Sequence, residues 1–151
     1  KKDFQSSTTG DPEISHASYQ TTRGILLNAS AEKVWPWIVL MGYRRDGWYG
    51  FDQMDSGGIP SANTILPEFQ SLQIGQIIGE EGLEVRSIRA NESLVLSFSY
   101  PNTVWVFKEG IWPKFGSSSL EYKLNAIDAD RTRLIIRMRF KLKFLALPTL
   151  W

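Results

Sequence analysis

The stretch Ser118–Phe144, SSLEYKLNAIDADRTRLIIRMRFKLKF, decides the fold, because it holds two alternating segments joined by a tight turn. Apolar side chains recur at every second position of both segments: Leu120, Tyr122, Leu124, Leu134, Ile136, Met138, Phe140 and Leu142. Basic side chains occupy the intervening positions of the second segment: Arg133, Arg137, Arg139, Lys141 and Lys143. A period of two predicts strands with one apolar and one polar face. The turn at Asp128-Ala129-Asp130 predicts that the two strands pair in antiparallel fashion.

The same pattern extends toward the N-terminus. Strands are expected at 19–28, 72–78, 83–90, 93–100 and 103–109, ahead of those at 118–127 and 131–144, with a turn region at 110–116. The connections between successive strands are short, which favours an antiparallel meander. Leu94, Leu96, Phe98 and Tyr100 share one face of their strand, as do Thr103, Trp105 and Phe107. One face of the sheet is therefore expected to be apolar and unusually aromatic.

A helix is expected from about Ala31 to Met41. Its apolar residues follow the i, i+3, i+4, i+7 spacing of one helix face: Val34, Trp37, Ile38 and Met41. Ser30 is a plausible N-cap and Gly42 a natural terminator, whereas Pro36 should bend the helix and remove one hydrogen bond. A second short helix is predicted at 47–54, within an irregular region that continues to Ser71.

The predicted sheet has more apolar surface than this short helix can cover. Each strand adds about 4.8 Å of width, so the helix would cover roughly half of a sheet of six or seven strands. The last residues, 144–151, are apolar and form no further element with a clear pattern. We therefore expect that a covering element follows Trp151, that the sheet curls around a cavity, or both.

Several segments resemble the START/birch-pollen-allergen helix-grip superfamily, also called SRPBCC. Val34-Trp35-Pro36-Trp37-Ile38 followed by Met41-Gly42 is similar to the first helix of its bacterial polyketide-cyclase/dehydrase-like members. Gly47-Trp48-Tyr49-Gly50-Phe51-Asp52 is similar to their Gly-Trp-Tyr-Ser-Tyr-Asp segment, and Gln76 replaces a usual Asp. Residues 132–137 resemble the last strand, so the resemblance covers about 19–144.

This resemblance implies an α+β helix-grip fold, a curved antiparallel sheet wrapped around a long C-terminal helix with an apolar cavity between them. Two short helices would follow the first strand. The long helix is absent from this chain, so residues 19–151 are expected to be a single helix-grip domain truncated at its C-terminus, preceded by an arm at 1–18.

Composition excludes several classes of function. The 151 residues include no Cys and one His, His16, which excludes disulfides, Cys-ligated metals and multi-His zinc sites. The net charge of +1 argues against a nucleic-acid partner. No metal and no cofactor are expected. No apolar run is long enough to span a membrane, and a cytoplasmic location is expected unless a targeting segment has been removed.

Aromatic residues around the expected cavity are the candidates for ligand binding. The predicted walls and polar anchors are Trp37, Arg45, Trp48, Tyr49, Phe51, Asp52, Phe98, Tyr100, Trp105, Phe107 and Tyr122. Asp52 and Arg45 would orient the ligand. The alternative is that these side chains are ordinary core, with Asp52 capping a helix or pairing with Arg44 or Arg45.

Three functions remain open from the sequence. The first is binding of a hydrophobic small molecule or lipid, for transport or sensing. The second is a cyclase/dehydratase-like enzyme acting on a polyketide-like or aromatic substrate, with Asp52 or Glu68 as general base. The third is a protein–protein module, for example a homodimer formed through the exposed sheet face.

The opposite sheet face carries a basic ladder formed by Arg131, Arg133, Arg137, Arg139, Lys141 and Lys143. It could attract anionic lipid or nucleic acid. Because the net charge is near zero, we favour a face neutralised by neighbours such as Glu121 and Glu84.

Overall fold

The computed structural model describes residues 6–42, 45, 47, 58–79, 82–99, 106–107, 110–111 and 114–143. A 3₁₀ turn, η1 (Asp11–Ile14), precedes strand β1 (Tyr19–Leu27), helix α2 (Ala31–Leu40) and a second 3₁₀ turn, η2 (Pro67–Phe69). The strands that follow are β2 (Ile77–Ile78), β3 (Leu83–Arg89), β4 (Ser93–Ser99), β5 (Val106–Phe107), β6 (Gly110–Ile111), β7 (Lys114–Asp128) and β8 (Arg131–Lys143).

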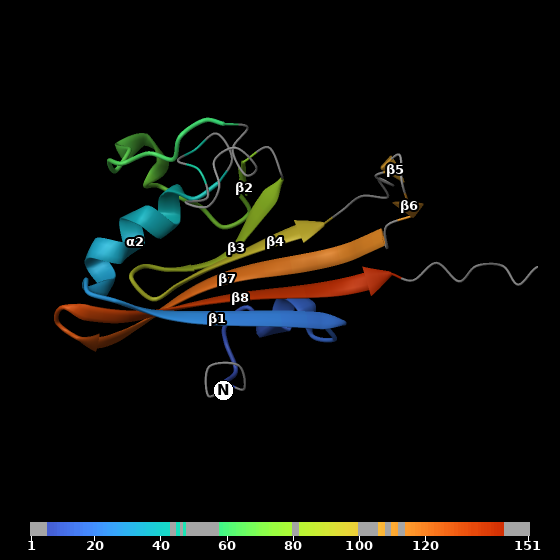
Figure 1. The fold of residues 1–151 in the computed structure, drawn as a ribbon, viewed down its shortest axis with the longest axis horizontal. Helices are drawn as coiled ribbons and strands as arrows, with labels where there is room; N and C mark the ends of the chain where they lie inside the picture. The colour runs from blue at the N-terminus through green and yellow to red at the C-terminus, as the bar shows by residue number, and fades with distance from the viewer. Residues whose placement is uncertain are drawn as a thin grey trace, which may run out of the picture.

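Six of these strands form one antiparallel sheet in the order β1-β8-β7-β4-β3-β2 (Figure 1). The first strand lies beside the last, with Tyr19 opposite Phe140 and Leu27 opposite Thr132. The two long alternating segments of the sequence, β7 and β8, lie next to each other near the middle of the sheet. This confirms the expected α+β class, in which a six-stranded antiparallel sheet has the short helix α2 packed on one face.

Two predicted strands differ from the structure. The segment expected at 72–78 is extended only at Ile77–Ile78, because Gly75 has a φ of +84° and turns the chain. Its amide donates to the Val85 carbonyl at 2.7 Å, and the Val85 amide donates to the Gln76 carbonyl at 2.9 Å. These bonds lie beside a register shift in β3 between Val85 and Ser87.

Of the strand expected at 103–109, the described residues are Val106–Phe107, and these pair with Gly110–Ile111 in a separate two-stranded sheet. The rest of this expected strand lies outside the described residues. The predicted turn region at 110–116 was therefore wrong, since it contains β6 and the first residues of β7. Glycine and proline within 110–116 suggested a turn, but β7 already pairs with β8 from Lys114 onward and accommodates Gly116 at a register shift.

Helix α2 begins and ends close to the prediction. Ser30 is its N-cap by backbone conformation, and its carbonyl accepts hydrogen bonds from the Lys33 and Val34 amides at 3.1 Å, although its side chain makes no cap bond. Gly42 follows the last turn with a φ of +138°, which favours glycine. Pro36 lies inside the helix, as the sequence predicted. The second helix expected at 47–54 falls mostly outside the described residues.

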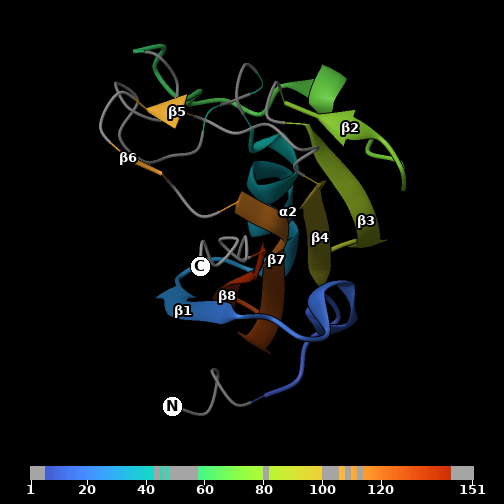
Figure 2. The same ribbon diagram turned by 90° about the vertical axis from the view of Figure 1, so that its right-hand side faces the viewer.

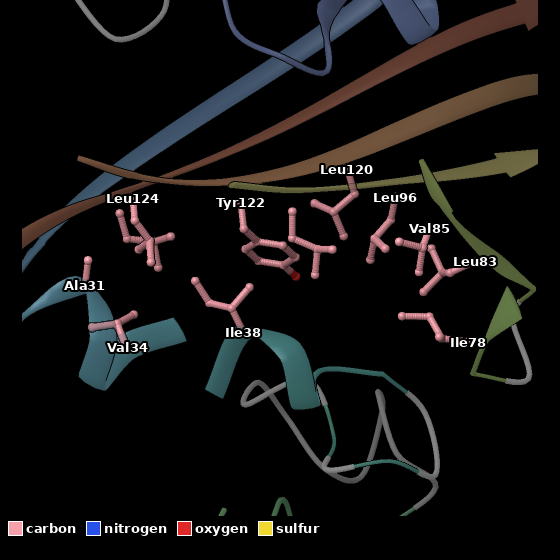
Figure 3. Close-up of a cluster of buried hydrophobic side chains, with 12 residues drawn as sticks. Ala31, Val34, Ile38, Ile78, Leu83, Val85, Leu96, Leu120, Tyr122 and Leu124 are labelled. Atoms are coloured by element: carbon pink, nitrogen blue, oxygen red, sulfur yellow. The ribbon is translucent and has the colours of Figure 1, made fainter. Parts of the chain in front are cut away.

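The core lies between α2 and the face of the sheet that we call the inner face. Figure 3 shows Ala31, Val34 and Ile38 of α2 pointing toward Leu124 and Tyr122 of the sheet. The full cluster of buried apolar residues is Ala31, Val34, Ile38, Ile78, Leu83, Val85, Leu94, Leu96, Leu120, Tyr122, Leu124 and Leu134. The expected alternation is thereby confirmed for β4, β7 and the first half of β8.

The opposite, outer face is covered in part, over β7 and β8, by the N-terminal segment, residues 6–18. Figures 1 and 2 place η1 and α2 on opposite sides of the sheet. Thr8, Gly10 and Ile14 are buried, and so are Glu121 and Arg137 of the sheet beneath them. The segment expected to be an arm is packed. The Arg137 and Arg139 guanidiniums pair with Asp11, a partner that the sequence analysis did not propose.

Candidate functional site

The inner face has a region beyond α2 where apolar side chains are only half-buried. Phe98, Ile136, Met138 and Phe140 belong to this region, and the first three pack against the core cluster. Because side chains alternate along strands, these residues point to the same side as Leu96 and Leu134. The structure thus leaves an apolar patch on the inner face, on strands β4 and β8, next to a sealed core.

Ser118 lies within this patch. By register it is opposite Phe98 on one side and Phe140 on the other, and it alternates with Leu120 on the inner face. The residue is 1% exposed, and its hydroxyl has no hydrogen-bond partner among the protein atoms. An unpaired buried hydroxyl is unfavourable, so a ligand group that paired with it would gain more than an ordinary contact.

Ser118 was not predicted as a site residue because the run Ser117-Ser118-Ser119 is typical of a polar strand end. One signal was present. Ser118 is two residues before Leu120, so the alternation already placed it on the apolar face.

The edge strand β1 adds three exposed side chains at positions that face the inner side. Tyr19 is 59% exposed, and its ring centroid lies 6.2 Å from that of Phe140. Arg23 is exposed and lies opposite Ile136 in the register, and Ile25 is exposed beside Leu134. The patch therefore has a cation at its border, which the sequence analysis also overlooked.

Of the predicted wall residues, Tyr122 and Trp37 are close to α2 rather than in the patch. Tyr122 is buried in the core and points toward Ile38 in Figure 3. Burial raises the pKa of its phenol above the ordinary value. Trp37 is half-buried on α2 itself. Phe98 is the predicted wall residue that the structure places in the half-buried patch.

Arg45, a predicted anchor, connects the end of α2 to η2. Its Nη2 donates to the carbonyls of Val39 at 3.1 Å and Phe69 at 3.0 Å, and its guanidinium lies 4.6 Å from the centre of the Phe69 ring. Burial lowers the pKa of this guanidinium. These contacts use one of its two terminal nitrogens for structure, and its role as a ligand anchor stays a prediction.

The remaining predicted site residues are not brought into the patch by any described contact. Trp48, Tyr49, Phe51, Asp52, Tyr100 and Trp105 lie outside the described residues, and Phe107 is described only as part of the β5 backbone. Glu68 is exposed on η2. A general base usually has a shielded site, so exposed Glu68 gives the enzyme hypothesis little support, and the role of Asp52 stays a prediction.

The described part of the chain contains no group of three or more His, Asp or Glu residues arranged to hold a metal ion. Within the same residues, no helix combines the length and the apolar character needed to cross a membrane.

Comparison with known proteins finds no matching family model and no matching curated protein. Among solved structures, the Zhui aromatase/cyclase from Streptomyces sp. R1128 is similar to this protein. The two sequences are 15% identical, and the TM-score is 0.35 over 85% of this chain and 70% of the aromatase/cyclase chain. This protein is also similar to a START superfamily protein from Mycobacterium smegmatis, with 12% identity and a TM-score of 0.34 over 85% and 80% of the two chains. Both likenesses are distant. The fold is defined by the strand order, the antiparallel pairings and the position of α2.

Proposed function

We propose that the protein binds a hydrophobic small molecule or lipid against the inner face of the sheet, beyond the end of α2. One observation carries this proposal: a half-buried apolar patch surrounds a buried hydroxyl that has no partner. Ligand sites in proteins are mostly apolar with a few placed polar groups, and this patch has that composition.

The residues indicate the kind of ligand. Phe98, Met138 and Phe140 would contact an apolar body, with about 25 cal/mol gained for each Å² of apolar surface removed from water. Ser118 would exchange a hydrogen bond with a carbonyl or hydroxyl of the ligand, and Arg23 at the border would attract a carboxylate. An amphipathic molecule such as a fatty acid fits these three features.

We also propose that residues 19–151 act as one unit in this binding. The support is that β1 and β8, the first and last strands of the sheet along the chain, pair along nine residues. The predicted aromatic residues outside the described part, Trp48, Tyr49, Phe51, Tyr100 and Trp105, remain proposed wall residues.

Two neighbouring positions of β4 provide a matched test. Phe98 faces inward and Ser97 faces outward, so Phe98→Lys and Ser97→Lys place the same side chain on opposite faces of one strand. Palmitate is titrated into each protein, with displacement of 1-anilinonaphthalene-8-sulfonate fluorescence as the readout. We expect Phe98→Lys to weaken palmitate binding at least tenfold and Ser97→Lys to leave it within twofold.

Cooperative urea unfolding of both variants serves as the control for folding. Equal palmitate affinity in folded Phe98→Lys and folded Ser97→Lys would contradict the proposed site. Failure of the wild-type protein to bind palmitate or the dye would contradict the proposed ligand class.

A further inference from the structure

The outer face of the sheet holds the carboxylate of Asp11 between two arginines. Arg137 Nη1 donates to Asp11 Oδ1 and Oδ2, both at 3.0 Å, and Arg139 Nη1 donates to Oδ1 at 2.8 Å. Arg137 is 2% exposed, and its Nε donates to the Thr22 hydroxyl of β1 at 3.1 Å. Strands β1 and β8 therefore fix this guanidinium from one side while Asp11 binds it from the other.

A second contact, in which the sheet supplies a carboxylate acceptor, lies beside the Asp11–arginine pairs. Glu121 of β7 is opposite Arg137 in the register and is also 2% exposed. Its Oε1 accepts a hydrogen bond from the Thr9 amide at 3.1 Å, and its Oε2 accepts one from the Gly10 amide at 2.9 Å. The sheet thus offers a carboxylate to two consecutive backbone N–H groups and two guanidiniums to the carboxylate that follows them.

Glycine fits closely at this position. A Cβ on Gly10 would lie 2.8 Å from Glu121 Oε2 and 3.2 Å from Val95 Cγ1, so a larger residue would force the turn or the Glu121 side chain to move. Residues 8–11 form a turn that is stabilised by its own hydrogen bonds. The Thr8 amide and hydroxyl both donate to the Asp11 carboxylate, at 3.0 and 3.1 Å.

We propose that Glu121, Arg137 and Arg139 form an acceptor site on the outer face for an acidic Gly-Asp peptide turn, and that Thr8–Asp11 of the same chain fills it as a releasable strap. When the strap has left, the acceptor binds a peptide of another molecule that contains the pattern X-Gly-Asp. The backbone N–H groups of X and Gly would bind Glu121, and the Asp carboxylate would bind the two arginines. The chemistry that recognises the partner is complementary on both sides, since Glu121 accepts hydrogen bonds from backbone N–H groups and the two arginines donate to a carboxylate.

Release is feasible because the strap is held mainly by polar contacts. Ile14 is the buried large apolar residue of the described N-terminal segment, whereas Glu121, Arg137 and Arg139 would become hydrated when the strap leaves. Hydration replaces the hydrogen bonds that are lost, so opening leaves these groups paired with water. The apolar core on the other face is unaffected by this opening.

The test uses the full chain with the substitution Gly10→Val, which displaces the strap and leaves the acceptor residues unchanged. A fluorescent peptide of residues 6–15, SSTTGDPEIS, is titrated into wild-type and Gly10→Val proteins by fluorescence anisotropy. We expect the peptide to bind the variant at least tenfold more tightly than the wild type, whose site is occupied. The same peptide with Asp11→Asn is the matched control and should bind the variant at least tenfold more weakly.

Equal binding of the two peptides, or equal binding to wild-type and Gly10→Val proteins, would overturn the proposal. Because Gly10→Val could disturb folding, native-state hydrogen exchange of the wild type provides a second measurement. The Thr9 and Gly10 amides should exchange at least 100-fold faster than the amide of Leu96 in the central strand β4. If all three amides exchange at the rate of global unfolding, the strap is not releasable and the proposal fails.

Discussion

The two faces of the sheet are held by opposite kinds of contact, although the same strands supply both. On the inner face, Leu120 and Ile136 contribute to an apolar core with α2. On the outer face, their neighbours Glu121 and Arg137 bind a short N-terminal segment through charge and hydrogen bonds. The difference follows from the period of two along each strand, which sends adjacent residues to opposite sides.

This comparison explains why one face can carry a binding site and the other a strap. Apolar contacts do not depend on exact geometry. The inner face, which α2 covers at one end, can therefore accept an apolar ligand at the other end. Charged contacts depend on geometry and on ionisation, so the outer face accepts one segment and responds to pH and salt. Substitutions that affect one face should therefore have a different signature from those that affect the other.

The largest loss is expected on the inner face. Ile38→Ala should reduce the free energy of unfolding by about 3–4 kcal/mol, because it removes buried methyl groups of α2 and leaves a cavity. Urea unfolding at pH 7 measures this loss. Ile74→Ala is the control, since this side chain is 70% exposed and its removal should change stability by less than about 0.5 kcal/mol. Similar losses for both variants would mean that α2 does not seal the core.

A smaller loss is expected for Arg137→Met on the outer face. Removing one partner of a buried ion pair destabilises by about 3 kcal/mol, and Asp11 is 20% exposed, so we expect about 2–3 kcal/mol. Unlike the loss of stability for Ile38→Ala, the loss for Arg137→Met should become smaller at low pH, where the acidic partners are protonated. Arg131→Met provides the control, because the ion pair of Arg131 with Asp128 is on the surface. A pH-independent loss for Arg137→Met would show that its packing, and not its charge, matters.

Asp11 should make stability depend on pH in a defined direction. Burial alone would raise the pKa of its carboxyl, but hydrogen bonds from the Thr8 backbone, Arg137 and Arg139 outweigh burial and hold the pKa below the ordinary value of 3.8. The contribution of Asp11 is therefore complete above about pH 4 and is lost as the pH falls through the lowered value. Asp11→Asn should lose about 1–2 kcal/mol at pH 7 and flatten the stability profile below pH 4. An unchanged acid limb in this variant would contradict the strap contact.

The smallest effect on stability is expected for Ser118→Ala. Its buried hydroxyl has no partner, so removing it should leave stability unchanged or raise it by up to about 1 kcal/mol. The same substitution should weaken palmitate binding about three- to tenfold, which corresponds to one lost hydrogen bond. Ser119→Ala, on the outer face, is the matched control and should not affect palmitate affinity. A large loss of stability for Ser118→Ala would show that the hydroxyl is already paired within the protein.

The sequence predicted the parts of the fold that depend on local periodicity. The alternation of β4, β7 and β8 and the limits of α2 were recovered because each is set by side chains close together in the chain. The packing of the N-terminal segment was not predicted, since it depends on pairs such as Asp11 with Arg137, which are 126 residues apart. Ser118 was not predicted because it lies in a run of three serines, although the alternation of its strand placed it on the apolar face. Arg23 was not predicted because its neighbours on β8 are far from it in the sequence.

The central claim is that the inner face binds an apolar ligand, and native mass spectrometry after incubation with palmitate tests it most directly. The wild-type protein and Ser97→Lys should each show a one-to-one palmitate adduct, and Phe98→Lys should show little or none. A wild-type spectrum without the adduct, or the same adduct in folded Phe98→Lys, would contradict the account.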